Sequence, residues 1–346
     1  MSAFGGFGIK SNTQLGVNKD NNDMLIHDMP DTISELAFSP DKRFLAGSCW
    51  DGNVYVWEFD ANFQSRQYAM VKHDKPALCC TWSPDGSLLF SGGADNLIRQ
   101  LNVATQATAI VGKHDQPIQE IRVVTNNGAL LLASASWDKT LKFWNLQSEM
   151  PVHTVNLPER PYAMDALDNL IVVGLSDCSF HYIDATNPNN VVKKDGPGTH
   201  QTTTIAMFPD KTGYAVCTVE GRTSINYFTQ SKENGHDNFT YRCHRTNNQT
   251  HPVNVIRFNP QTGTFATAGA DGMICFWDKV ARSKTGSLEK LGSPVTAMAY
   301  SPDGRKFAYA LGYDWGKGVA FADPQMKNQL FLHTLSNDEY FPKGQK

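Results

Sequence analysis

A serine, a histidine and an aspartate near the middle of the chain have the side chains of a hydrolytic triad. His114 stands 24 residues before Asp138, and Ser134 and Ser136 lie between them. A histidine held between a serine and a carboxylate can turn the serine into a nucleophile. These residue types are therefore compatible with acyl-transfer chemistry.

The same arrangement recurs along the chain, which argues against catalysis. Histidines stand 20 to 24 residues before an acidic residue of a predicted turn at His27, His73, His114, His200 and His251. A catalytic site is one local assembly with its own oxyanion hole, whereas packing groups repeat with the fold. The chain also has no GxSxG elbow, GxxxxGK(S/T) phosphate loop or HExxH zinc motif. We therefore expect a protein that is not an enzyme and needs no metal or cofactor.

The acidic turn residues themselves follow a regular period. They occur at Asp51, Asp95, Asp138, Asp177, Glu220, Asp271 and Asp314, with successive spacings of 44, 43, 39, 43, 51 and 43 residues. Three of them precede a tryptophan by six residues, namely those before Trp57, Trp144 and Trp277. A period of ~40–45 residues with a Trp-Asp-like signature is typical of WD-repeat propellers. Seven copies predict an all-β fold, a seven-bladed WD-repeat β-propeller.

The ends of the chain differ from the repeats. A short apolar run over residues 24–26 precedes the first full copy. We expect it to form a strand in the last blade, because such a strand closes the ring and covers exposed sheet edges. The predicted organisation is a polar, disordered leader (1–22) with Phe-Gly pairs at Phe4 and Phe7, a propeller (23–335) and a tail (336–346).

Composition restricts the class of protein further. Hydrophobic residues make up 40% of the chain, and no run approaches the ~18 apolar residues of a membrane helix. The seven cysteines lack metal-site spacing, so we expect reduced thiols in an intracellular compartment. The net charge of −3 argues against a protein that coats nucleic acid over its whole surface, although it does not exclude a local basic site.

The propeller interpretation gives the triad-like residues a structural role. In WD repeats a histidine commonly bonds the turn aspartate, and a strand serine and the repeat tryptophan complete the network. In the third blade we expect this network to consist of His114, Ser134, Asp138 and Trp144. A buried, fully hydrogen-bonded network of this kind fixes the geometry of a blade.

A binding site is expected where the repeat is irregular. The 51-residue interval between Glu220 and Asp271 holds a polar insertion over residues 231–251, and long loops are often functional. From 239 to 290 there are seven Lys or Arg against three acids, or +4. Cations interleaved with aromatic rings suit an extended peptide with acidic side chains or single-stranded nucleic acid. A solvated rim with Trp277 in the core is the alternative.

The whole chain resembles one family, and four short passages carry the resemblance most specifically. They are CHRTNN (243–248), TFATAGADG (264–272), FWDK-x-AR-x-K (276–284) and YDWGKG (313–318). Together they resemble the WD-repeat messenger-RNA export factors of the nuclear pore. A related family, the WD-repeat proteins of the mitotic spindle checkpoint, shares the first three passages in part. The fourth passage and the Phe-Gly pairs favour the export factors.

The resemblance implies a non-enzymatic adaptor, monomeric within a heteromeric complex, without membrane insertion. Its implied location is the nucleus, the nuclear envelope and the nuclear pore, with shuttling to the cytoplasm. Its implied partners are a short hairpin motif of an FG-type nucleoporin and single-stranded RNA; a checkpoint scaffold that binds kinetochore kinases is the alternative. The implied contact residues are Arg222, Phe239, Tyr241, Arg242, Trp277, Asp278, Lys279, Arg282 and Lys284.

Overall fold

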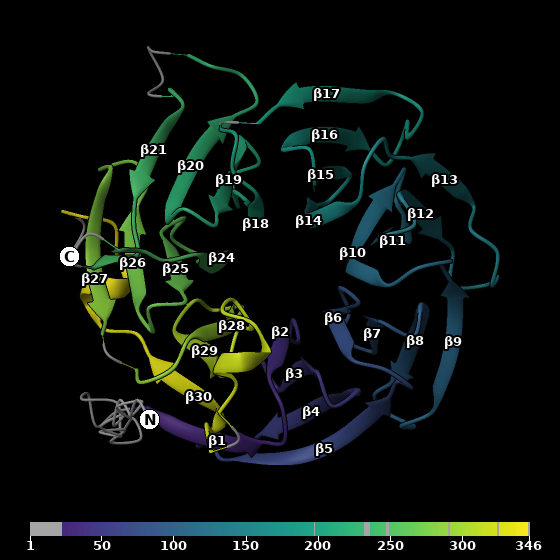
Figure 1. Ribbon diagram of the computed structural model, residues 1–346. Helices are drawn as coiled ribbons and strands as arrows, with labels where there is room; N and C mark the ends of the chain where they lie inside the picture. The colour runs from purple at the N-terminus through teal and green to yellow at the C-terminus, as the bar shows by residue number, and fades with distance from the viewer. Residues whose placement is uncertain are drawn as a thin grey trace, which may run out of the picture.

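The computed structural model describes residues 23–196, 198–231, 236–246, 249–289, 291–323 and 325–344. Over these residues the chain forms seven four-stranded antiparallel sheets, which stand as blades around a central axis (Figure 1). The blades follow one another around the ring in chain order. The prediction of a seven-bladed β-propeller is confirmed, while the predicted disorder of the leader falls outside the described residues.

In the first six blades the strands run outward from the axis in chain order. Blades one to three consist of β2 Ile33–Phe38, β3 Phe44–Cys49, β4 Asn53–Phe59, β5 Ser65–Lys72; β6 Ala77–Trp82, β7 Leu88–Gly93, β8 Leu97–Asn102, β9 Thr108–Lys113; and β10 Ile118–Asn126, β11 Ala129–Ser136, β12 Thr140–Trp144, β13 His153–Asn156. Blades four to six consist of β14 Pro161–Leu167, β15 Leu170–Leu175, β16 Ser179–Asp184, β17 Val191–Asp195; β18 Thr202–Met207, β19 Gly213–Thr218, β20 Arg222–Tyr227, β21 Phe239–Arg242; and β24 Val253–Phe258, β25 Phe265–Gly269, β26 Ile274–Asp278, β27 Ser283–Leu288.

The seventh blade is assembled from both ends of the chain. It holds β28 Val295–Tyr300, β29 Lys306–Leu311 and β30 Asn328–Thr334, with β1 Met24–Met29 as its outermost strand. The pairing of β1 with β30 is antiparallel and aligns Met24 with Leu332 and Met29 with Asn328. The predicted closing strand is therefore confirmed. The bonds between β1 and β30 cover a sheet edge that would otherwise lie open at the seam.

The two ends of the ring carry different kinds of turn. We call the end at which the first strand of each blade begins the upper end, and the other the lower end. The Asp-containing turns between second and third strands lie at the upper end, as do the connections between blades. Ser-Pro-Asp turns such as residues 39–41 join first to second strands at the lower end, where the fixed backbone of proline favours a turn.

Each innermost strand has a β-bulge after its first residue. The pairing register shifts at this point in β2, β6, β10, β14, β18, β24 and β28. A bulge re-aims a side chain at the place where it interrupts the ladder. The seven bulged residues all line a cavity at the upper end of the central channel: Ser34, Leu78, Gln119, Tyr162, Thr203, Asn254 and Thr296.

Short elements occupy the connections. The hairpin of β22 Arg245–Thr246 and β23 Gln249–Thr250 lies between blades five and six, and the 3₁₀ helix η1 Val319–Phe321 lies between β29 and β30. The C-terminal segment is not a free tail. It forms α1 Asn337–Tyr340, whose Tyr340 ring is buried in the core beneath the Arg305 guanidinium, 3.8 Å from the ring centre.

The described residues add two facts relevant to the class of protein. All seven cysteines carry free thiols, and six of them are buried. No helix in the described ranges has the length and apolar character required to span a membrane.

Candidate functional site

The four residues named for the third blade are in contact at the upper end of the ring. His114 Nδ1 lies 2.8 Å from Asp138 Oδ2, and His114 Nε2 lies 2.7 Å from Ser134 Oγ. The Trp144 indole N–H donates to the same Ser134 oxygen at 2.7 Å. His114, Ser134 and Trp144 are each at most 3% exposed, so a substrate has no access to the serine.

Electrostatics match a structural role for this network. Burial lowers the pKa of His114, and its bond to Asp138 opposes that effect without cancelling it. Burial tends to raise the pKa of Asp138, but bonds from His114 and Thr140 outweigh burial and hold that pKa well below its ordinary value. A neutral imidazole donates from Nδ1 to the carboxylate and accepts the Ser134 hydroxyl at Nε2. Every polar atom of the set then has a partner.

The histidine bridge of this network recurs in two other blades, but one histidine was wrongly predicted. His73 bridges Asp95 and Ser91 in the second blade. In the sixth blade His244, and not His251, bridges Asp271 and Thr267. The β22–β23 hairpin separates the two histidines, so the histidine before the hairpin enters the blade and the histidine after it does not.

The histidine rule also fails in blades one and five. In the first blade the Tyr55 hydroxyl, not His27, donates to Asp51 at 2.6 Å. In the fifth blade His200 pairs with Glu220 at 2.9 Å, but both side chains are more than a third exposed. These two blades therefore lack the buried network.

Four of the predicted partner-binding residues are buried in the propeller. Trp277 is 8% exposed, and its indole N–H donates to Thr267 Oγ1 at 2.9 Å. Tyr241 is also 8% exposed, and its hydroxyl donates to the Asp278 carbonyl at 2.9 Å. The two rings lie 4.8 Å apart and belong to the core between blades five and six. Neither ring is exposed for contact with a partner, contrary to expectation. Trp277 occupies the tryptophan position of the repeat, and Tyr241 packs against it from the neighbouring blade.

Asp278 and Lys279 likewise make internal contacts. The Asp278 carboxylate accepts the backbone N–H groups of Val280, Ala281 and Lys343, at 2.8, 3.0 and 2.9 Å. Asp278 thus ties the C-terminal segment to the turn after β26. Lys279 is 8% exposed, donates to Asp210 at 2.8 Å and lies over the Phe208 ring. Neither side chain is free to bind a partner.

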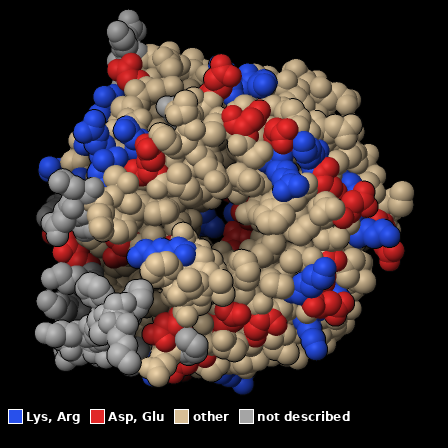
Figure 2. Space-filling model, viewed as in Figure 1, with Lys and Arg blue, Asp and Glu red and all other residues tan. Residues whose placement is uncertain are grey.

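The other five predicted residues reach the surface, in two groups. Arg222 and Arg242 lie directly opposite each other on β20 and β21, at the upper end of the ring. Arg222 is 3.5 Å from Glu220, while Arg242 is exposed and pairs with no carboxylate among the described residues. Figure 2 shows Lys and Arg side chains gathered at the edge of the ring beside these strands, at the upper left of the view.

The second group lies near the lower end of blades five and six. Phe239 begins β21, and the Arg282 guanidinium covers its ring at 4.4 Å from the centre. Lys284, on β27, is exposed and donates to Ser287 Oγ at 3.2 Å. Because Phe239 pairs with Ile225 while Arg242 pairs with Arg222, the length of β21 separates the two groups. The single basic-aromatic face expected from sequence is two separate patches.

Sequence reasoning missed the exposed tryptophans of the upper end. Trp50 and Trp137 each precede the turn aspartate of their blade and are 41% and 37% exposed. Trp315 is 41% exposed and stacks on Trp50, with ring centres 6.4 Å apart. The Trp-Asp pairs at residues 50–51 and 137–138 could have indicated these exposed rings, since the repeat does not require the residue before a turn acid to pack in the core.

Comparisons with known proteins agree with this architecture. The family model "WD domain, G-beta repeat" matches residues 24–58, 65–100, 107–145 and 235–278. The chain is 38% identical to the "Poly(A)+ RNA export protein" of Schizosaccharomyces pombe, over 91% of each chain. It is 36% identical to the "mRNA export factor GLE2" of Chaetomium thermophilum, over 97% of each chain. "Protein Rae1" of Drosophila melanogaster is also 36% identical, over 93% of this chain and 96% of that one.

Solved structures support the fold independently of sequence. The structure of U3-55K matches with a TM-score of 0.78 at 15% identity, covering 92% of this chain and all of that one. At this identity the likeness concerns the fold alone. The relatives above, by contrast, share more than a third of their residues with this chain over nearly their full length. The chain therefore belongs to the family of WD-repeat messenger-RNA export factors.

Proposed function

We propose that this chain is a non-enzymatic adaptor in messenger-RNA export that acts in the nucleus and at the nuclear pore. The names of its relatives support the role in export. The burial of its triad-like residues supports an adaptor rather than a hydrolase. The observation that carries the assignment of binding surfaces is the division of the exposed cations into two patches on blades five and six.

The upper patch, Arg222 and Arg242, is assigned to acidic side chains of a nucleoporin hairpin. Two like charges placed directly opposite each other on neighbouring strands destabilise a sheet. Such a pair is stabilised when a carboxylate of a partner lies between the guanidinium groups. Arg245 adds a third exposed cation nearby, and its Nη2 donates to the Glu220 carbonyl at 3.2 Å.

The lower patch, Phe239, Arg282 and Lys284, is assigned to single-stranded RNA. Bases stack on aromatic rings and on guanidinium planes, while Lys and Arg contact phosphates. The half-buried Phe239 ring and the guanidinium above it offer one such stacking position. Lys284 follows two residues after Arg282 and supplies a further positive charge.

Titration of a single-stranded oligoadenylate at several salt concentrations tests the lower patch. The double variant Arg282→Glu/Lys284→Glu removes two phosphate contacts, so the slope of log affinity against log salt should fall by about 1.4. Phe239→Ala should weaken binding by ~1–3 kcal/mol and leave the slope unchanged, because it removes stacking but no charge.

A matched control uses two exposed lysines on β17 in blade four. Lys193→Glu/Lys194→Glu makes the same change in net charge far from the lower patch, and it should leave the slope as in the wild type. If the two double variants weaken RNA binding equally, binding depends on net charge alone and the lower patch is not the RNA site. Unchanged binding in both would remove RNA from the proposal.

A further inference from the structure

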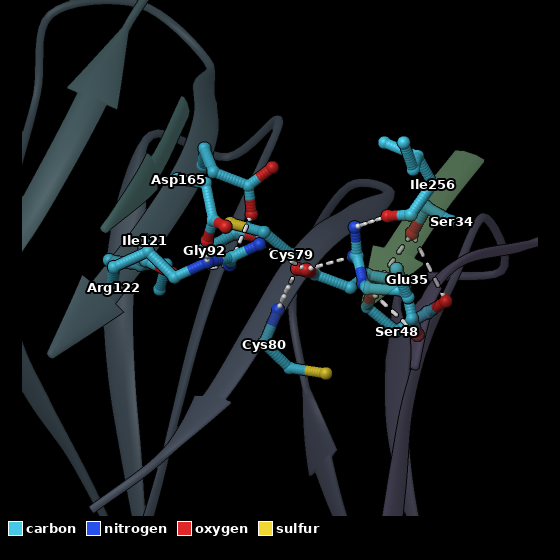
Figure 3. A network of polar contacts seen from close by, with 12 residues as sticks. Ser34, Glu35, Ser48, Cys79, Cys80, Gly92, Ile121, Arg122, Asp165 and Ile256 are labelled. Carbon is cyan, nitrogen blue, oxygen red and sulfur yellow. Dashed lines mark hydrogen bonds and ion pairs between the residues drawn. The ribbon is translucent and has the colours of Figure 1, made fainter. Parts of the chain in front are cut away.

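An ionic network lies in the wall of the central channel, where the repeat pattern predicts no charge. The Glu35 carboxylate on β2 accepts three hydrogen bonds (Figure 3). The donors are Arg122 Nη2 at 2.9 Å, Arg257 Nη2 at 3.0 Å and the Cys80 backbone N–H at 3.0 Å. Arg122 on β10 also donates to Asp165 on β14 at 2.9 Å. The network thus joins innermost strands from blades one, two, three, four and six.

The network has one more carboxyl group than it has guanidinium groups. Glu35, Glu120 and Asp165 face two arginines, Arg122 and Arg257. Glu35 and Asp165 each accept a backbone N–H as well, the latter from Met207. Glu120 accepts a hydrogen bond from Arg122 Nη1 at 2.6 Å and shares a side-chain hydrogen bond with Glu35. No backbone N–H of the described residues donates to it. Of the three carboxyl groups, Glu120 is therefore the one that no backbone N–H holds, and it is the best placed to accept a further cation.

Glu120 also lines the cavity at the mouth of the channel. The cavity measures about 400 Å³, and its lining includes Glu35, Arg257 and the seven bulged residues. Trp50 and Trp137 stand on its rim with about two fifths of each residue exposed. Figure 2 shows the open centre of the ring with both acidic and basic side chains in its wall. The cavity is large enough for a single long side chain and has aromatic rings at its rim and a carboxyl group in its wall.

We propose that the mouth of the channel binds a lysine or arginine side chain of a partner polypeptide, which passes the Trp50 and Trp137 rings and pairs with Glu120. A cation is attracted to the face of an indole ring within about 6 Å of its centre. The side chain would supply the positive charge that balances the third carboxyl group of the network. This site is distinct from the two patches of blades five and six, so it stands or falls independently of the proposed function.

Binding a cation here should release a proton. Burial raises the pKa of Glu120 well above its ordinary value, and the neighbouring Glu35 raises it further, against the opposing effects of the Arg122 and Arg257 charges. The raised pKa favours the neutral acid at Glu120 in the free protein. When the basic side chain pairs with it, Glu120 ionises and its proton passes to solvent. Before binding, two carboxylates balance the two arginines while Glu120 is neutral. After binding, three carboxylates balance the two arginines and the incoming cation, so the net charge is zero in both states.

Blocked pentapeptides with a single central arginine or lysine test the proposal on the full chain. The matched controls replace arginine by citrulline and lysine by norleucine, which keep similar shape but carry no charge. Calorimetry should give at least a tenfold weaker affinity for both neutral peptides. Titrations in two buffers of different ionisation enthalpy should report release of close to one proton per bound cation at neutral pH.

Protein variants then locate the site. Glu120→Gln should weaken the cationic peptides about tenfold and abolish proton release, while Glu149→Gln, an exposed acid of the same blade, should change neither. Trp50→Ala should weaken binding and reduce the change in tryptophan fluorescence. Equal affinity for charged and neutral peptides, full affinity in Glu120→Gln, or no binding at millimolar peptide would each overturn the proposal.

Discussion

At the scale of single residues, the tryptophan network of the third blade depends on a close approach by its neighbour. The Trp144 ring lies so near Gly112 on β9 that a Cβ at position 112 would stand 2.2 Å from a ring carbon. Only glycine leaves room for the ring there. The ring therefore joins blades two and three, and the hydrogen bond to Ser134 fixes its orientation.

Loss of this ring should destabilise the fold without changing partner choice. We expect Trp144→Ala to lower the free energy of unfolding by ~3–5 kcal/mol, because a buried aromatic side chain is replaced by a cavity. Urea denaturation gives the measurement. Gly112→Ala should destabilise the same contact by overpacking, whereas Trp50→Ala, at an exposed ring, should have little effect. Wild-type stability in the Trp144 variant would contradict the structural role assigned to the network.

A second residue, His333 on β30, connects both ends of the chain. Its Nδ1 lies 2.5 Å from Asp23, and its Nε2 lies 3.1 Å from Glu339. Burial lowers the pKa of His333, but its bonds to the two carboxylates outweigh burial and raise the pKa to about 9. An imidazolium with a carboxylate on each nitrogen thus holds the residue before β1 and the helix α1 to the last blade.

Stability should therefore fall as the pH rises above neutrality. Since the folded pKa exceeds the unfolded value of about 6.5, the contribution of His333 is complete below pH 6.5 and is lost as the pH passes 9. A shift of this size corresponds to ~3 kcal/mol. The free energy of unfolding is measured at pH 6.5 and at pH 9.5 for the wild type and for His333→Gln. The loss of stability between the two pH values should be larger in the wild type by about this amount. Equal pH dependence in the two proteins would show that this imidazole is not charged.

The sequence correctly predicted the roles of residues that recur with the repeat. It did not predict burial or pairing that depends on contacts with neighbouring blades. His114, Ser134 and Asp138 were found because the spacing repeats. The burial of Tyr241 was not visible, because the residues around it come from the next blade, including the Asp278 carbonyl that accepts its hydroxyl. The partners of Glu35, likewise, come from strands 87 and 222 residues away in sequence. Contacts of that range leave no local pattern.

At the scale of elements, the fold depends on a strand that lies outside the regular repeats. The β1 strand pairs with β30 along its length and covers the edge of the last blade. Its apolar run and the need to close the ring made it predictable. The α1 segment was not predictable, because four residues have too little periodicity to mark a helix and the Tyr340 ring is buried through tertiary contacts.

Removing β1 should destabilise the whole ring. A protein that lacks residues 1–30 loses the closing strand and the Asp23 carboxylate, so we expect a melting temperature at least several degrees below that of the wild type. A protein that lacks residues 1–18 keeps both and should melt like the wild type. Differential scanning calorimetry compares the two, and equal melting temperatures would mean that the seam does not need β1.

At the scale of the whole molecule, charge is distributed unevenly over a chain of net charge −3. The fold and the number of blades followed from the period, and the excess of positive charge near blades five and six followed from counting residues. The separation of the exposed cations into upper and lower patches could not be predicted in this way. Residues at the two ends of one strand are close in sequence but lie at opposite ends of the ring. The proposed contact with a nucleoporin depends on the upper patch.

Affinity purification of the full chain from cells, with bound proteins identified by mass spectrometry, tests that role most directly. The account predicts that an FG-type nucleoporin accompanies the wild type and the Lys193→Glu/Lys194→Glu control. It should be lost from a folded Arg222→Glu/Arg242→Glu variant, because each substitution places a negative charge against the acidic hairpin. Kinetochore kinases in place of a nucleoporin, or a nucleoporin that stays bound to the Arg222→Glu/Arg242→Glu variant, would contradict the account.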